Sequence, residues 1–259
     1  MSIKKGEFIS TYYSDQRRCF LKADDKEYFC KNGTGSKDPT IDPKIWLMNE
    51  MLYSVFAEKI DLPIPEVKFL VNNNILYVGS EYLHNRVSLH LVDREHALQN
   101  LPNKIILTEI FLLDIFLFNS DRYGWNILVD KVGKVWAIDH DKCFMGDGKN
   151  DIHRFTNFSE KKLQYILDYT PYGLLNSIVL EPANIGRLMD FAKQLAFLLR
   201  MVTLEELSEK MPPEVFGLVN TDYFAKIKIW INFVAEFFDS RSNIEELVSK
   251  LKERGKLNE

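Results

Sequence analysis

The sequence predicts a two-lobed α+β fold, in which a small antiparallel sheet with one helix precedes a larger, mainly helical lobe. Two observations predict it. The first 84 residues follow the order strand, strand, helix, strand, strand, whereas the pattern from residue 157 onward is helical throughout. Between these parts, residues 118–144 have the pattern of a polar loop and a short hairpin. We therefore expect a β-rich lobe at residues 1–84 and a helical lobe at residues 85–259.

Composition limits the class of protein. The 259 residues are 46% hydrophobic and 13% aromatic, which is enough for a sizeable core. The formal net charge of −4 argues against a protein that coats nucleic acid. The apolar run at residues 105–118 is broken by Glu109 and Asp114, so we expect no membrane-spanning segment.

The three cysteines include no CxxC pair, which is typical of a reducing compartment, and we predict a cytoplasmic protein. Cys19 and Cys30 fall on neighbouring expected strands and could face each other, but we expect buried thiols. The histidines show no ligand spacing with the cysteines, so no zinc site is predicted.

The amino-terminal elements follow in chain order. Residues 17–23 and 26–32 flank a polar turn at Asp24 and Asp25, which is typical of a β-hairpin. Residues 45–60 carry apolar side chains at helical spacing. The segment 62–71 begins with two prolines and becomes a strand, and after an asparagine turn at 72–74 the strand 75–83 pairs back with it.

The larger lobe begins with residues 103–119, which are apolar on nearly every side and predict a buried helix. A short hairpin follows, with strands at 126–130 and 135–139. Later helices are expected at 160–169, 185–201, 203–210, 221–238 and 244–254, the last capped by Ser242 or Asn243. The helix 221–238 carries an aromatic stripe that we assign to the core, not to a separate interaction module. The stripe consists of Tyr223, Phe224, Trp230, Phe233, Phe237 and Phe238.

Three polar residues around the hairpin are candidates for chemistry. Asn126 begins one expected strand and Asp139 ends the other, so their oxygens can point at one place. A carboxylate and an amide oxygen make a partial shell for Mg²⁺ that leaves room for phosphates and water. Asp121, one short loop away, could orient a hydroxyl and accept its proton, as phosphoryl transfer requires. The same residue types also serve as turn residues and local ion pairs, and the spacing leaves both interpretations open.

Two residues of the first lobe favour the chemical interpretation. Lys31 ends the second strand of the first hairpin, and Glu50 lies on the following helix. A strand lysine tied to a glutamate on the adjacent helix is the ion pair that holds a lysine against nucleotide phosphates. Each alone is typical of a surface residue. Together with Asp121, Asn126 and Asp139 in this chain order, they predict a nucleotide site.

With these residues in place, the sequence resembles the protein-kinase-like fold and, within it, the HipA-like kinases. It is more distantly similar to type II phosphatidylinositol 4-kinases. The resemblance is carried by CKN around Lys31, NEMLYSVFAEKIDLPIPEV at 49–67, VGSEYL at 78–83, NSDRYGWNILVD at 119–130 and WAIDHDKCF at 136–144. It covers roughly residues 15–145. It implies ATP, Mg²⁺ and phosphoryl transfer to a hydroxyl.

The resemblance also implies roles for residues of the first lobe. Lys31 would hold the α- and β-phosphates of ATP, and Glu50 would brace it. The hinge would be Glu81, Tyr82 and Leu83, whose backbone groups would bind adenine.

In the larger lobe the resemblance makes Asp121 the catalytic base and makes Asn126 and Asp139 the catalytic ligands of Mg²⁺. Arg122 would have a structural or phosphate-neighbouring role. His140 replaces the Phe of the ordinary kinase Asp-Phe-Gly, and we do not expect it to bind the metal.

The sequence departs from the kinase pattern in two places. No Gly-rich turn is present near residues 14–16, where glycines would let the backbone approach phosphate. The Gly-rich residues 33–37 follow the Lys31 strand, so we interpret them as a flexible connector. Tyr123 occupies the place where relatives commonly have His.

Three functions remain open at this point. The first is an ATP-dependent serine/threonine-protein kinase of the HipA-like type, with residues 145–155 as an acceptor segment or activation loop. The second is a small-molecule or lipid kinase. The third is a nucleotide-binding pseudokinase that acts as a scaffold. The expected partners are ATP, an unknown protein or small-molecule acceptor and an antitoxin-like protein. Neither a membrane nor direct nucleic-acid binding is expected.

Overall fold

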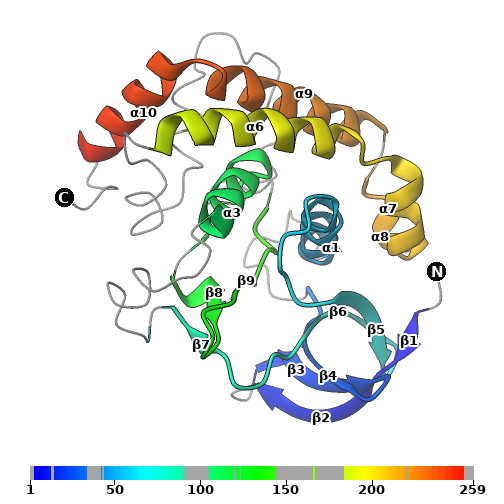
Figure 1. Cartoon of the computed structure of the whole chain (residues 1–259). Helices are drawn as coiled ribbons and strands as arrows, with labels where there is room; N and C mark the ends of the chain where they lie inside the picture. Colours follow the sequence, from blue (N-terminus) through cyan, green and yellow to red (C-terminus); the bar gives the residue numbers. More distant parts are fainter. Residues whose placement is uncertain are drawn as a thin grey trace.

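The computed structural model describes residues 3–12, 15–33, 42, 44–89, 91, 105–119, 121–122, 124–143, 166, 184–219 and 221–253. Over these residues a curled, mainly antiparallel sheet lies at one end of the molecule and a layer of long helices at the other (Figure 1). The predicted two-lobed α+β fold is confirmed. Within the same ranges, none of the helices combines the length and hydropathy needed to cross a membrane.

The larger sheet has six strands in the order β1-β5-β6-β4-β3-β2. They are β1 (Lys4–Lys5), β2 (Glu7–Tyr12), β3 (Asp15–Ala23), β4 (Lys26–Lys31), β5 (Val67–Asn72) and β6 (Ile75–Glu81). The pairing of β1 with β5 is parallel and all others are antiparallel. Both β1 and β2 were absent from the prediction, because their mostly exposed side chains give no alternating apolar signal.

Gly6 lets the sheet curl. β1 and β2 are consecutive in the chain yet lie at opposite edges of the sheet, and Gly6 joins them. Its N–H donates to the carbonyl of Val71 at 3.0 Å. A Cβ atom at this position would lie 2.9 Å from Cδ1 of Leu21, so only glycine fits without displacing a core side chain.

Both hairpins predicted in the first lobe have tight two-residue turns. Asp24 and Asp25, and likewise Asn73 and Asn74, all have positive φ values, between 49° and 62°. Two successive residues of this kind match the right-handed twist of paired strands, and Asp and Asn tolerate the conformation well.

The cysteine prediction also holds on these strands. Cys19 and Cys30 are paired in register on β3 and β4, and both are buried free thiols.

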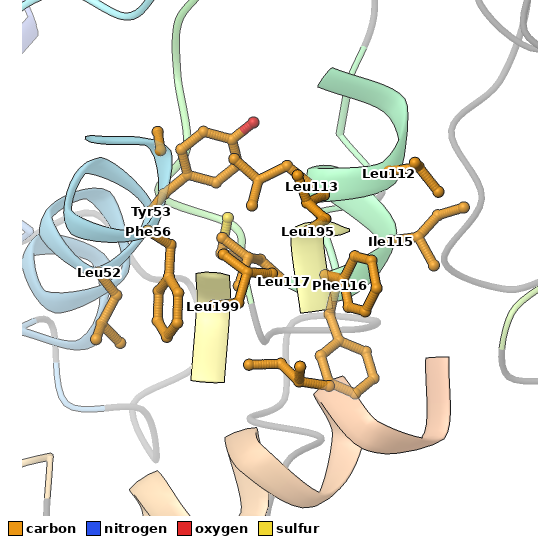
Figure 2. Close-up of a cluster of buried hydrophobic side chains, with 14 of the residues drawn as sticks. Leu52, Tyr53, Phe56, Leu112, Leu113, Ile115, Phe116, Leu117, Leu195 and Leu199 are labelled. Carbon is orange, nitrogen blue, oxygen red and sulfur yellow. The ribbon is translucent and has the colours of Figure 1, made fainter. Parts of the chain in front are cut away.

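The helices surround a shared core. They are α1 (Lys44–Lys59), α3 (Ile105–Phe116), α6 (Ile185–Arg200), α7 (Leu204–Lys210), α8 (Pro213–Phe216), α9 (Thr221–Phe238) and α10 (Arg241–Glu253). Figure 1 shows α1 between the sheet and the carboxy-terminal helices. In Figure 2, Tyr53 and Phe56 of α1 gather with Phe116 of α3 and Leu195 and Leu199 of α6. The helix beside the sheet therefore belongs to the core of both lobes.

The aromatic stripe of α9 is buried along its whole length, as predicted for core residues. The start of α10 differs from the prediction. The helix begins at Arg241, and the backbone N–H of Asn243 approaches the hydroxyl of Ser240 at 3.4 Å. Ser242 and Asn243 lie inside the helix, so neither caps it. The short helix α8 was not predicted, because a single turn that starts at Pro213, after Pro212 as its N-cap, has no periodicity to detect.

Some predictions lie outside the described residues. These are the helix at 160–169 (apart from Ile166, which is helical and buried), residues 34–37, Tyr123 and the segment 145–155.

Candidate active site

The loop that carries Asp121 leaves α3 through a strained but well-anchored turn. Phe118 has a φ of 55°, in the left-handed region that a bulky residue rarely adopts. Its backbone N–H donates to the backbone carbonyl of Ile115, and the backbone N–H of Asn119 donates to the backbone carbonyl of Asp114 at 2.7 Å. These two bonds form a Schellman motif. The Phe118 ring stacks on Trp230 of α9 with centroids 4.0 Å apart. The stacking holds Phe118 in a position that usually takes glycine.

Arg122 fixes this loop to the hairpin that follows. Its side chain is fully buried and forms an ion pair with Asp114 of α3, with Nε 2.9 Å from Oδ2 and Nη2 3.0 Å from Oδ1. Its Nη1 donates to the backbone carbonyls of Asn126 and Ile138, and Nη2 bonds to Nδ1 of His140 at 2.8 Å. All five donors of the guanidinium are therefore used. Arg122 has the structural role, and its burial excludes contact with phosphate.

The hairpin brings Asn126 and Asp139 together. A short 3₁₀ turn (Gly124–Asn126) precedes β8 (Ile127–Val129), which pairs with β9 (Val135–Ala137) and with β7 (Val87–Ser88). Asn126 therefore ends a turn and does not begin a strand, which corrects the prediction. The backbone N–H of Ile138, the residue before Asp139, donates to the backbone carbonyl of Asn126 at 3.0 Å. This bond holds the backbone at Asn126 close to the backbone at Asp139. β7 is too short to leave a sequence signal.

The Asn126 side chain is oriented by the loop. Its Nδ2 donates to the backbone carbonyl of Asp121 at 2.8 Å, which leaves the amide oxygen as the atom that can face a cation. Asp139 lies two residues beyond β9 with a φ of 63°. This left-handed residue turns the chain after the strand, and Asp tolerates it better than most residues.

Lys31 meets three carboxylates from two parts of the chain. Its Nζ lies 3.7 Å from Oε2 of Glu50 and 3.0 Å from Oδ2 of Asp141, and it also bonds to Oδ1 of Asp139. The predicted pair of Lys31 and Glu50 is present. The ammonium group of Lys31 thus joins β4, α1 and the segment after β9. The Lys31 side chain is only 14% exposed.

Burial and charge shift the pKa values of this cluster. Burial alone would lower the pKa of Lys31, but the charges of Asp139, Asp141 and Glu50 raise it well above its usual value. Burial raises the pKa of Glu50 to about 7, against the opposing charge of Lys31. Burial would also raise the pKa of Asp139, but the charge and hydrogen bond of Lys31 lower it. Lys31 is therefore a permanent cation, and Asp139 a permanent anion, at neutral pH.

His140 is a neutral packing residue. Because a guanidinium only donates, Nδ1 of His140 accepts from Arg122 and the ring proton is on Nε2. Burial and the charge of Arg122 lower the pKa of His140 well below its usual value. The ring stacks on Tyr53 of α1 at 3.7 Å, and the backbone N–H donates to Oε2 of Glu50 at 2.9 Å. His140 thus links Glu50 to the Arg122 network.

Asp121 has a cationic neighbour. Its Oδ2 lies 2.7 Å from Nζ of Lys142, and the side chains of Asp121 and Lys142 are 21% and 49% exposed. Lys142 follows Asp141 directly in the chain, so the segment after β9 contacts both Lys31 and Asp121.

A cleft of about 290 Å³ opens at this cluster. Its walls come from β3, β4, β6, α1 and the segment after β9. The charged lining residues are Arg17, Arg18, Lys31, Asp141 and Lys142, and the apolar ones include Trp46, Leu47 and Val78. Since four of the five charged side chains are cationic, the cleft favours an anion.

The expected hinge lies at the end of β6. The backbone N–H of Glu81 donates to the backbone carbonyl of Glu66 at 2.8 Å, and that of Tyr82 donates to the backbone carbonyl of Glu27 at 2.7 Å. These two donors are occupied, so the expected hinge contacts are reduced to carbonyl groups and the N–H of Leu83. Tyr82 is 44% exposed, and its ring packs edge-on against Phe20 with centroids 5.3 Å apart.

The residues present fit a divalent cation. Glu50, Asp139 and Asp141 carry three potential negative charges against the single charge of Lys31 in a largely buried cluster. Among the residues that the structure describes, no group of three or more His, Cys, Asp or Glu side chains has the geometry of a metal site. A Mg²⁺ site for phosphoryl transfer commonly uses only one or two carboxylates, with substrate phosphates completing the shell. Asp139 and the amide oxygen of Asn126 match that smaller donor set.

Comparison with known proteins gives a structural match. No family model and no curated protein matches the sequence. The solved structure of the Helicobacter pylori proinflammatory kinase CtkA matches with a TM-score of 0.58 over 95% of this chain and 99% of that chain, at 13% sequence identity. The chain has a kinase-like fold. At this identity the match shows the fold alone.

Of the residues predicted for phosphate and metal binding, Lys31 lines the cleft and contacts Glu50 and Asp139. Asn126 is tied to the Asp121 loop, and Arg122 and His140 are buried. Sequence reasoning missed Asp114 and Lys142 as parts of the site, and it missed Asp141. Asp114 did leave a signal, because a carboxylate inside a helix that is apolar on nearly every side requires a buried partner.

Proposed function

We propose that this protein is an ATP- and Mg²⁺-dependent phosphotransferase that transfers the γ-phosphoryl group to a hydroxyl, with a protein Ser or Thr as the acceptor. One observation carries the proposal. Lys31, braced by Glu50, meets Asp139 across the lobes. Lys31 also contacts Asp141, and the next residue, Lys142, contacts Asp121. The kinase-like fold supports the same reaction class.

Each side of the cleft has a task in this proposal. Lys31 binds the α- and β-phosphates as a point charge, and Glu50 keeps its ammonium at the cleft. Backbone groups of residues 81–83 bind the adenine ring. Because the positions of Asn126 and Asp139 are fixed by Arg122 through adjacent backbone carbonyls, the reacting groups need little rearrangement when the nucleotide binds.

Asp139 and the amide oxygen of Asn126 would hold Mg²⁺. When bound, the ion neutralises charge on the phosphate oxygens and orients them for in-line attack. The chain's own carboxylate at Asp121 accepts the proton of the attacking hydroxyl. Its backbone carbonyl is tied to the Asn126 side chain, so the base and the metal ligand keep a fixed spacing.

A pseudokinase scaffold is the second candidate function. Lys31 is already engaged by three carboxylates, and residues 12–17 contain no glycine that could cover the phosphates. Both features would suit a protein that binds nucleotide without transferring phosphate. A lipid or small-molecule acceptor would use the same cleft and differs only in the substrate.

Labelling with γ-labelled ATP tests the proposal. The purified chain is incubated with Mg²⁺ and a cell lysate, beside Asp121→Asn and a control, Asp130→Asn, which changes a carboxylate at the hairpin turn. We expect label on protein Ser or Thr with the wild type and Asp130→Asn, and none with Asp121→Asn. Nucleotide binding without label on any protein, lipid or small molecule would support the scaffold instead.

A further inference from the structure

The wall of the cleft that the sheet forms presents a second cation beside Lys31. Arg18 of β3 is paired in register with Lys31 of β4. Residues directly opposite each other on antiparallel strands point to the same face of the sheet, with Cβ atoms about 4.5–5.5 Å apart. Both residues line the cleft. The sheet therefore supplies a guanidinium next to the ammonium that is proposed to bind phosphates.

The wall formed by the segment after β9 presents Lys142. Its ammonium contacts Oδ2 of Asp121 at 2.7 Å and also lines the cleft. An ammonium has three donors, and one of them is used at Asp121. Because Asp121 is proposed to receive the acceptor's proton, Lys142 lies at the end of the cleft where the phosphoryl group is transferred.

We propose that Lys142 binds the γ-phosphate from the wall formed by the segment after β9 and that Arg18 binds the β- and γ-phosphates from the sheet wall. This inference rests on the proposed function and deepens it, because it assigns the phosphate contacts that no Gly-rich turn provides. A Gly-rich turn binds phosphate through backbone N–H groups. In this chain two side chains on opposite walls would perform that task, and a guanidinium fork suits phosphate oxygens well.

The two positions predict different nucleotide specificities. Lys142 would contact only the γ-phosphate, so its loss should weaken triphosphate binding and leave diphosphate binding unchanged. Arg18 would contact β- and γ-phosphates, so its loss should weaken both and leave monophosphate binding unchanged. Loss of one charge-assisted contact should lower affinity by about tenfold to a hundredfold.

Equilibrium titration measures these affinities directly. The full chain with Mg²⁺ is titrated with the non-hydrolysable β,γ-imido analogue of ATP, with ADP and with AMP. The variants are Lys142→Gln and Arg18→Gln, with Lys142→Arg and Arg18→Lys as conservative replacements. Matched controls are Lys131→Gln, in the exposed hairpin turn, and Arg187→Gln, on the exposed side of α6. Thermal unfolding of every variant verifies that it is folded.

We expect Lys142→Gln to lose affinity for the triphosphate analogue alone and Arg18→Gln to lose affinity for the analogue and ADP. The conservative variants should recover part of the loss, and both controls should match the wild type. Equal affinities of the folded Gln variants and the wild type for all three nucleotides would overturn the inference while leaving the proposed function intact. A wild type that binds no nucleotide would overturn the proposed function itself.

Discussion

Arg122 and Asp114 form an ion pair in which neither side chain reaches solvent, with Nε of Arg122 2.9 Å from Oδ2 of Asp114. Removing one partner of such a pair leaves a buried charge without compensation. We therefore expect Arg122→Gln to lower the free energy of unfolding by about 3–5 kcal/mol, measured by urea denaturation.

An exposed pair of the same chemistry provides the control. Arg241 and Glu245 on α10 are also 2.9 Å apart, but both side chains are more than half exposed. Arg241→Gln should cost only about 0.3–0.5 kcal/mol. Equal losses at Arg122 and Arg241 would contradict the structural role assigned to Arg122.

The pKa of Glu50 predicts a pH dependence of stability. Burial raises this pKa from 4.5 to about 7, so the folded chain binds a proton at Glu50 more tightly than the unfolded chain does. Its stabilising contribution is complete below pH 4.5 and is lost as the pH rises through about 7. Glu50→Gln keeps the shape of the side chain and does not titrate. The free energy of unfolding of the wild type minus that of Glu50→Gln should therefore fall by about 2.5 kcal/mol between pH 5 and pH 8.

Urea denaturation of both proteins at several pH values tests this directly. A difference that stays constant, or that grows with pH, would show that Glu50 is ionised throughout and that its burial is compensated in another way.

Phe118 and Trp230 predict a coupled pair of mutations. The left-handed conformation of a non-glycine residue costs roughly 1–2 kcal/mol, and Phe118→Gly would relieve that strain. In the wild type the same change also removes the stacking on Trp230, so we expect net destabilisation by about 2 kcal/mol. In a Trp230→Ala background the stacking is already absent, so the cost of Phe118→Gly should be smaller by about 0.5–1.5 kcal/mol, the contribution of an aromatic pair. Equal costs in the two backgrounds, measured by denaturation, would show that the rings are not coupled.

Gly79 supports the strand that carries Lys31. A Cβ atom on Gly79 would lie 2.9 Å from Sγ of Cys30 and 3.0 Å from Cβ of Tyr28, both on β4. Gly79→Ala should therefore destabilise the chain by about 1–3 kcal/mol. Gly186→Ala on α6, where nothing lies within 4 Å of the new atom, should instead stabilise it by up to about 1 kcal/mol. A stabilising Gly79→Ala would indicate that β4 and β6 are farther apart than described.

Local sequence signals predicted most of the central elements. The Asp-Asp and Asn-Asn turns fix two hairpins, and the apolar helix predicted at residues 103–119 is observed at Ile105–Phe116. The order of Lys31, Glu50, Asp121, Asn126 and Asp139 along the chain predicted one nucleotide site. The structure joins Lys31 to Glu50 and Asp139 and ties Asn126 to the Asp121 loop.

The remaining features depend on tertiary contacts. The exposed strands β1 and β2 are held by pairing at the two edges of the sheet, not by their own pattern. Asp141 and Lys142 enter the site only because the chain turns at Asp139, which no local spacing reveals. The sequence leaves a structural and a phosphate-neighbouring role open for Arg122, because the partners of its five donors come from α3 and from the hairpin.

The proposed function depends on one nucleotide held between Lys31 and Asp139. The most direct measurement is ATP affinity by calorimetry with and without Mg²⁺, for the wild type, Lys31→Met and Asp139→Asn. We expect Mg²⁺ to strengthen binding to the wild type by at least about tenfold. Lys31→Met should bind weakly under both conditions, and Asp139→Asn should lose the Mg²⁺ dependence. Wild-type binding that is indifferent to Mg²⁺ and unchanged by both substitutions would contradict the account.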